Sequence, residues 1–164
     1  MVSEQGADLE WGRLSELDEA TRETRMLERY AALALLPEEE RRTQVRSMAN
    51  AEYSLPDEKL REFTLSRMRA WIALDQEQGP LIANSYDAVM QDMPAGIAMK
   101  RVSLVQTLVI AFTPEEEARL RELVPRVFAG APNRALTALE RNEGSFEVAK
   151  QTRKKAWWAF WAKG

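Results

Sequence analysis

The chain has 164 residues, of which 45% are apolar and 30% are charged, and it contains neither cysteine nor histidine. This composition is that of a globular protein, and the length suits one domain that buries a sizeable core. The missing residue types exclude a thiolate nucleophile, an imidazole base, a zinc site built on Cys or His and a Glu-x-x-His di-iron site. We therefore expect no metal and no cofactor.

Charge is divided unevenly along the chain. The net charge is −3, but residues 1–149 carry all 26 acidic residues and residues 150–164 carry five basic residues and no acidic one. Such asymmetry is typical of proteins that bind an acidic partner, which includes membrane surfaces, nucleic acids and acidic proteins. We interpret residues 1–144 as an acidic helical body and residues 145–164 as a basic, Trp-rich C-terminal helix.

The N-terminal sequence has no basic region followed by an apolar stretch, so it does not read as a secretory signal. This predicts a cytoplasmic protein. Residues 1–8 are polar and are expected to form a loose arm, followed by a helix that continues to Leu36. Ser15, with Asp18 three residues later, approximates a capping box within that stretch.

Two further helices are predicted to open at a proline followed by acidic residues, at Pro37 and at Pro56. Proline is tolerated at the first helical position, and acidic side chains complement the positive end of the helix dipole. Leu-Pro-Glu-Glu-Glu, Leu-Pro-Asp-Glu and Thr-Pro-Glu-Glu-Glu resemble copies of a repeat. We interpret their spacing as uneven, however, and expect independent helix starts rather than an array of fixed period.

Gly79-Pro80 is expected to end the helix that begins at Pro56, and residues 81–93 are expected to form the next one. The segment Ile97–Phe112 is the most apolar run of the chain, yet it is too short to cross a bilayer. We predict that it is the central core helix, with a buried strand as the alternative.

Thr113 and Glu116 form a capping box for the following helix, in which Pro125 should introduce a break. A short helical segment is expected over residues 133–141, with Gly144 as its C-terminal stop. The predicted fold is therefore all-α, an irregular helical bundle of seven to eight helices packed around residues 97–112.

The C-terminal sequence KQTRKKAWWAFWAKG is the stretch that a core does not explain. Aromatic and basic side chains lie on much the same side of a helix and differ in depth along its axis. The candidate binding residues are Lys150, Arg153, Lys154, Lys155, Trp157, Trp158, Phe160 and Trp161. This pattern is typical of docking to a membrane surface or to a membrane protein complex. The alternatives are that the rings complete the core, or that they mediate self-association into a homo-oligomer.

Nucleic acid is a poor candidate partner because the patch is short and the body is acidic. A second functional hypothesis is a soluble regulatory or ligand-binding domain, which holds an apolar small molecule among methionines and aromatic rings. The residues proposed for that site are Trp71, Tyr86, Met90, Met93 and Met99.

An enzyme that uses Mg²⁺ would need converging carboxylates, but neither Asp87 with Asp92 nor the run Glu115–Glu117 has a spacing that converges on one face. The sequence also lacks a Gly-rich phosphate loop, a nucleophile elbow and a Rossmann fingerprint. We therefore predict a non-enzymatic accessory or adaptor protein that is cytoplasmic and peripherally attached to a membrane.

Overall fold

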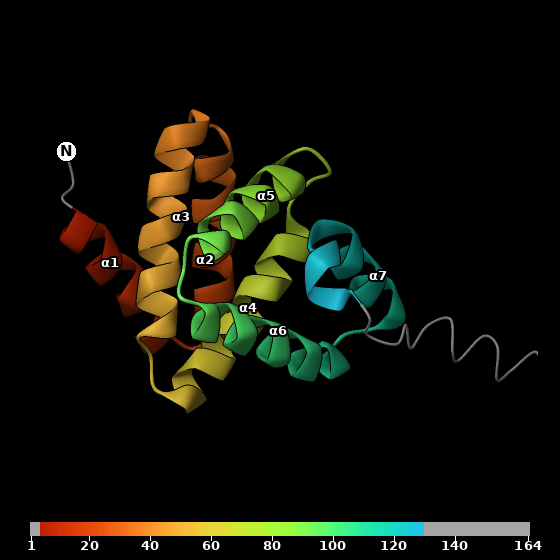
Figure 1. Ribbon diagram of the computed structural model, residues 1–164. Helices are drawn as coiled ribbons and strands as arrows, with labels where there is room; N and C mark the ends of the chain where they lie inside the picture. Colours follow the sequence, from red (N-terminus) through yellow and green to blue (C-terminus); the bar gives the residue numbers. More distant parts are fainter. Residues whose placement is uncertain (1–3, 130–164) are drawn as a thin grey trace, which may run out of the picture. The chain divides into compact units, whose positions relative to one another are not determined.

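The computed structural model describes residues 4–129, with side chains described from residue 9 onward. This part of the chain contains seven α-helices, three short 3-10 helices and no strand, which confirms the all-α fold (Figure 1). The α-helices are α1 (Glu4–Arg13), α2 (Glu19–Ala34), α3 (Glu38–Tyr53), α4 (Asp57–Ala73), α5 (Gln78–Gln91), α6 (Ala95–Leu108) and α7 (Pro114–Leu123). The 3-10 helices are η1 (Leu14–Glu16), η2 (Val109–Ala111) and η3 (Pro125–Phe128).

The helices α2, α3, α4, α6 and α7 begin at positions that differ by 19 residues or a multiple of 19. The residues that precede these starts are Asp18, Pro37, Pro56, Pro94 and Thr113. Asp75 stands at the same position of the period ahead of α5, which begins three residues later at Gln78. Our interpretation of the Pro-acidic starts as independent was therefore wrong. Asp75 and Pro94 had not been recognised as capping positions, and without them the remaining starts look uneven.

Local hydrogen bonds explain why the helices begin at these positions. The Asp18 carboxylate accepts from the Thr21 N–H at 3.0 Å, and the Asp75 carboxylate accepts from the N–H of Gln78 at 2.6 Å. Both carboxylates satisfy an amide that has no partner inside the helix. The pKa of Asp18 is lowered, chiefly by the hydrogen bond from Thr21. Thr113 and Glu116 form the predicted capping box in full.

Three sequence predictions about helix ends are corrected by these caps. Asp18, not Ser15, caps α2, and a break over η1 separates α2 from α1. The backbone is helical from Glu4, so the loose arm predicted for residues 1–8 is wrong over its second half. Gly79 and Pro80 lie in the first turn of α5 instead of ending α4, because the first amides of a helix need no helical acceptor.

The prediction for Pro125 is confirmed. The helix α7 ends at Leu123, and the chain continues from Pro125 as the 3-10 helix η3. This is expected because a proline ring clashes with the carbonyl four residues earlier and removes an amide donor.

The helices α1 to α5 pack mainly on the helix after next or the one two before. The helices α1, α3 and α5 follow one another in one row and α2 and α4 in a second row, with α7 and α6 next in each row. Figure 1 shows this progression from α1 to α7. We call each stretch of 19 residues one unit of the repeat. Two consecutive units make a helix pair of 38 residues, which is within the range of known α-helical repeat arrays.

Core positions recur with the same period. One position of the 19-residue period is buried in every described unit. The residues at this position are Leu14, Leu33, Glu52, Trp71, Met90, Val109 and Phe128. The core is therefore one continuous cluster that runs along the array, in which each unit contributes an equivalent side chain.

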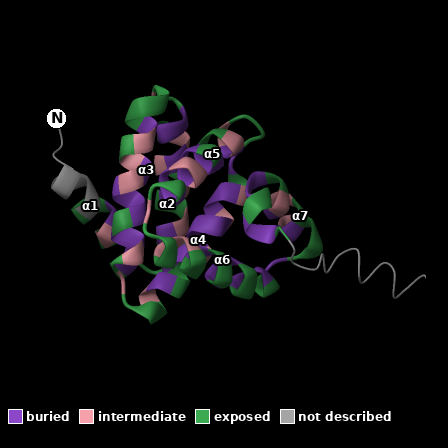
Figure 2. Ribbon diagram, in the orientation of Figure 1, coloured by how far each residue is buried: buried purple, intermediate pink, exposed green. Residues whose placement is uncertain are grey.

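The centre of the bundle is α4 rather than the segment 97–112. α4 contacts α2, α5, α6 and α7, and most of its residues from Leu60 to Trp71 are buried. The helix α6 buries one side only, and Met99 and Ile110 are 72% and 74% exposed (Figure 2). The placement of Ile97–Phe112 at the centre was wrong because a high apolar content does not show whether both sides of a helix are covered.

Candidate functional site

The predicted docking residues, from Lys150 to Trp161, lie outside the residues that the structure describes. Their arrangement therefore stays a prediction. Over the described part of the chain, no helix combines the length and apolar character needed to cross a membrane.

The five residues proposed to hold an apolar ligand do not line a common cavity. Trp71 and Tyr86 are fully buried and meet edge to face, with ring centroids 5.1 Å apart. Met90 is also buried, whereas Met99 projects from the outer side of α6. Helical spacing places residues on a face but does not show whether that face is filled by other side chains, so the ligand-binding hypothesis stays a prediction.

The carboxylates considered for Mg²⁺ are engaged elsewhere. Asp87 pairs with Arg101, and Asp92 accepts from Arg46 at 2.9 Å. Glu116 belongs to the capping box of α7, and Glu117 pairs with Arg121 at 2.8 Å. Within residues 9–129 no cluster of acidic side chains has the arrangement of a metal site.

The most unusual chemistry in the described structure is an ion pair in the centre of the core. The Arg67 Nε atom of α4 donates to the Glu52 Oε1 atom of α3 at 3.1 Å, and the two side chains are 1% and 0% exposed. Thr64 donates to the same oxygen at 2.6 Å, and the Tyr86 hydroxyl donates to Oε2 at 2.8 Å. Three donors thus replace the water that this carboxylate would bind outside.

Aromatic rings enclose the guanidinium of this pair. The Arg67 Cζ atom lies 4.6 Å from the ring centroid of Trp71 and 4.5 Å from that of Tyr86. A second guanidinium, that of Arg101, lies 4.8 Å from the Tyr86 centroid. Such stacking is favourable for a desolvated guanidinium because the ring faces carry negative potential.

These surroundings shift the pKa values of the cluster. Burial alone would lower the pKa of Arg67, but the negative charge of Glu52 raises it above its usual value. Burial raises the pKa of Tyr30 and Tyr86, and it raises that of Tyr53 to about 12. The arginine therefore stays charged and the tyrosines stay neutral under ordinary conditions.

The sequence analysis missed this cluster, although the period contains the signal. Glu52 stands at a position that is apolar in the other described units. The position of Arg67 is less regular, because its equivalents include Arg29 and Tyr86 as well as Met48, Val105 and Val124. A buried charge needs a charged partner nearby, so comparing the described units singles out Glu52 but does not identify Arg67 as its partner.

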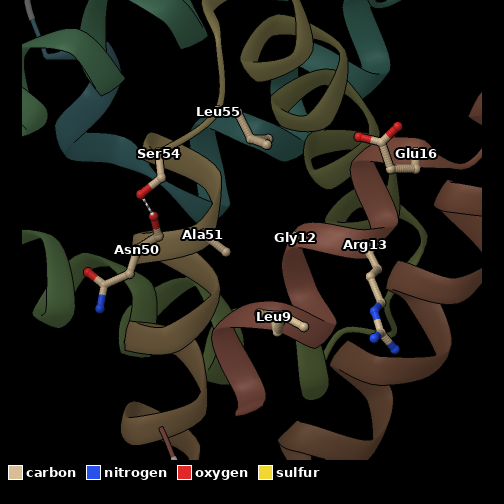
Figure 3. Close-up of a pocket in the computed structure, with 8 residues that line it drawn as sticks. All are labelled: Leu9, Gly12, Arg13, Glu16, Asn50, Ala51, Ser54 and Leu55. Atoms are coloured by element: carbon tan, nitrogen blue, oxygen red, sulfur yellow. Dashed lines mark hydrogen bonds between the residues drawn. The ribbon is translucent and has the colours of Figure 1, made fainter. Parts of the chain in front are cut away.

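An open groove lies between the first helix and the end of α3. It has a volume of about 710 Å³, with one wall from α1 and η1 and the other from α3 and the turn that follows (Figure 3). Its lining residues are Leu9, Gly12, Arg13, Glu16, Asn50, Ala51, Ser54 and Leu55. The Ser54 hydroxyl is already used in a bond to the Asn50 carbonyl at 2.7 Å. The groove offers a shallow, largely apolar surface without converging polar groups.

Comparison of the chain with models of protein families, with curated proteins and with solved structures gives no match.

Proposed function

We propose that this chain is a non-enzymatic adaptor whose helical repeat body is held at an anionic membrane surface by its basic, Trp-rich C-terminal segment. The observation that carries the proposal is the charge division, with every acidic residue before residue 150 and a basic, aromatic segment after it. Basic side chains near an anionic bilayer contribute about 1 kcal/mol each, and indole rings favour the headgroup level.

The body suits the role of a scaffold. Helical arrays with a recurring core present extended surfaces on which partner proteins bind. The charged groups at its centre, Glu52 and Arg67, are closed off from solvent and stabilise one another. The acidic body is repelled by an anionic bilayer, so attachment through the tail would leave the body turned toward the cytoplasm.

Co-sedimentation of the full chain with vesicles tests the proposal. We expect binding to vesicles that contain phosphatidylglycerol and none to pure phosphatidylcholine. Replacing Lys150, Arg153, Lys154 and Lys155 by Gln should weaken binding by about 4 kcal/mol, which is roughly a thousandfold.

A matched control removes four positive charges from the body, by Arg25→Gln, Arg61→Gln and Arg126→Gln at exposed positions and Arg42→Gln at a half-buried one. This variant should bind as the wild type does or more weakly by a small factor. Equal losses in the two variants would show a response to net charge only, and the proposal would be abandoned. Failure of the wild type to bind any anionic vesicle would favour a protein partner in the membrane.

A further inference from the structure

The groove between α1 and the end of α3 is bordered by an exposed apolar side chain. Leu9 is 62% exposed, although Trp11 and Leu14, which follow it closely in the sequence, are buried. Leu9 also stands at a position of the 19-residue period that is buried at each equivalent from Ser47 to Leu123. A leucine that projects at the edge of an apolar groove marks a candidate contact surface.

Small side chains make the groove deep enough to receive such a leucine. Gly12 opens it on the α1 side, because a Cβ atom added there would meet nothing within 4 Å beyond its own helical turn. Ala51 contributes a small side chain from α3, and the half-buried Leu55 follows it (Figure 3). The same patch therefore carries both a projecting apolar side chain and an apolar recess.

The charges that line the groove are balanced, unlike those of the body. Residues 1–129 contain 23 acidic and 16 basic residues, so two such bodies repel each other over most of their surface. The groove has one charge of each sign, Arg13 and Glu16, and Figure 3 shows the two side chains extending away from one another. Glu16 is 72% exposed and lies 3.4 Å from Lys59. A contact at this patch escapes the repulsion and leaves both charges within reach of a partner.

A second copy of the chain suits these features better than other partners. In a twofold symmetric contact the same patch lies on both sides, so each group must find its complement within one patch. This patch supplies a leucine with a recess and an arginine with a glutamate. A nucleic acid would find no excess of basic side chains there. A small molecule would be little buried in so open a groove.

We propose that two copies of the chain dimerise through the groove between α1 and α3, with Leu9 of each copy packed in the groove of the other. Arg13 of one copy pairs with Glu16 of the other, and the symmetry axis repeats this contact. The inference rests on residues 9–55 and is independent of the membrane binding proposed above.

Sedimentation equilibrium of the full chain without lipid measures the dimerisation constant. Leu9→Asp should weaken dimerisation at least tenfold, because a charge replaces the apolar side chain that the contact buries. The matched control is Leu35→Asp, at a leucine that is 81% exposed at the end of α2, and it should dimerise as the wild type does. Far-UV circular dichroism verifies that both variants are folded.

Charge reversal tests the proposed geometry. Arg13→Glu or Glu16→Arg alone should weaken dimerisation about tenfold or more, because two attractive contacts become repulsive. The double variant Arg13→Glu/Glu16→Arg should regain the wild-type constant, and an equimolar mixture of the two single variants should form the mixed dimer. Arg25→Glu and Glu28→Arg, at the exposed pair on α2, make the same changes in net charge and should have little effect.

Three results would overturn the proposal. The first is a wild-type chain that stays monomeric at every concentration. The second is association that neither Leu9→Asp nor the charge reversals weaken, which would assign self-association to another surface such as the Trp-rich tail. The third is a double variant that dimerises more weakly than either single one, because Arg13 and Glu16 would then not meet across the axis.

Discussion

Removing either partner of the buried Glu52–Arg67 pair should destabilise the protein far more than removing both. Glu52→Leu leaves a guanidinium that is 1% exposed without its carboxylate, and Arg67→Met leaves a carboxylate that is 0% exposed without its cation. Breaking a buried ion pair in this way costs about 3–5 kcal/mol. Each single variant should therefore lose much of a typical stability of about 5–15 kcal/mol.

The double variant Glu52→Leu/Arg67→Met replaces the pair by the residues found at the same positions in adjacent units. Leu33 is equivalent to Glu52, and Met48 is equivalent to Arg67. Apolar residues of similar volume are often neutral or stabilising in place of a buried pair. The Thr64 and Tyr86 hydroxyls lose their acceptor, however, at about 1–3 kcal/mol each. The double variant should still be more stable than either single one.

Urea unfolding of the four proteins, followed by far-UV circular dichroism, gives the coupling energy of the cycle. We expect about 3 kcal/mol or more. The exposed pair Glu38–Arg42, whose charged atoms are 4.0 Å apart, provides the control cycle and should give about 0.5 kcal/mol or less. If the losses of the two core variants simply add in the double variant, the pair is not coupled and the assignment of the cluster as a mutually stabilised unit is refuted.

Three further predictions follow from the described contacts. Burial raises the pKa of Tyr30 and Tyr86, and that of Tyr53 to about 12, so ultraviolet titration should show no tyrosinate near pH 10. Because each neutral phenol is favoured in the folded state, this stability is present below the unfolded pKa of about 10 and is lost as the pH rises through the folded values. Ionisation of all three rings near pH 10 would contradict the burial. Thr113→Ala should lower the free energy of unfolding by about 0.5–2 kcal/mol in urea, through loss of the cap on α7, and no change would mean that the capping box contributes nothing. Arg41→Ala should cost about 1.5–3 kcal/mol because Arg41 bonds to Ser85 and to the Leu36 carbonyl, whereas the neighbouring Arg42→Ala should cost little.

Helix type and approximate extent could be predicted from the sequence because the signals are local. Prolines followed by acidic residues, and the Thr113 capping box, act within one turn, and the structure places helix starts at each of them. The centre of the fold could not be predicted in this way. The central helix α4 buries Thr64, Ser66 and Arg67, so its apolar content is modest. These three polar side chains bond to residues of other helices, which a local pattern does not show.

The period predicts only one member of the buried pair. Compared across the described units, Glu52 is exceptional because its equivalents are apolar, whereas Arg67 has Arg29 among its equivalents. Tyr86 and Trp71, two of the residues proposed for a ligand site, lie against the guanidinium of Arg67, which the local pattern did not show either. The tail prediction remains open, since it lies outside residues 4–129.

The period also divides the aromatic residues of the tail into two classes. Trp158 is equivalent to Phe63, Ile82, Arg101 and Leu120, which are buried, whereas the earlier equivalents Arg25 and Gln44 are not. Trp161 is equivalent to Ser47, Ser66, Ser85, Leu104 and Leu123, which are buried, whereas Leu9 and Glu28 are exposed. Trp157 falls at a position that is mostly exposed in the earlier units, and Phe160 at one that is half-buried or exposed in all of those described.

This division predicts different effects for the two pairs of substitutions in the full chain. Trp157→Ala/Phe160→Ala should reduce binding to anionic vesicles and leave the unfolding midpoint unchanged, because the rings would face the bilayer. Trp158→Ala/Trp161→Ala should lower the midpoint, since removing a buried aromatic ring costs about 3–5 kcal/mol. Loss of vesicle binding without loss of stability in both variants would mean that the repeat does not extend to the tail and that all four rings serve docking. Loss of stability in both would make the rings core residues and leave the basic side chains as the only membrane contact.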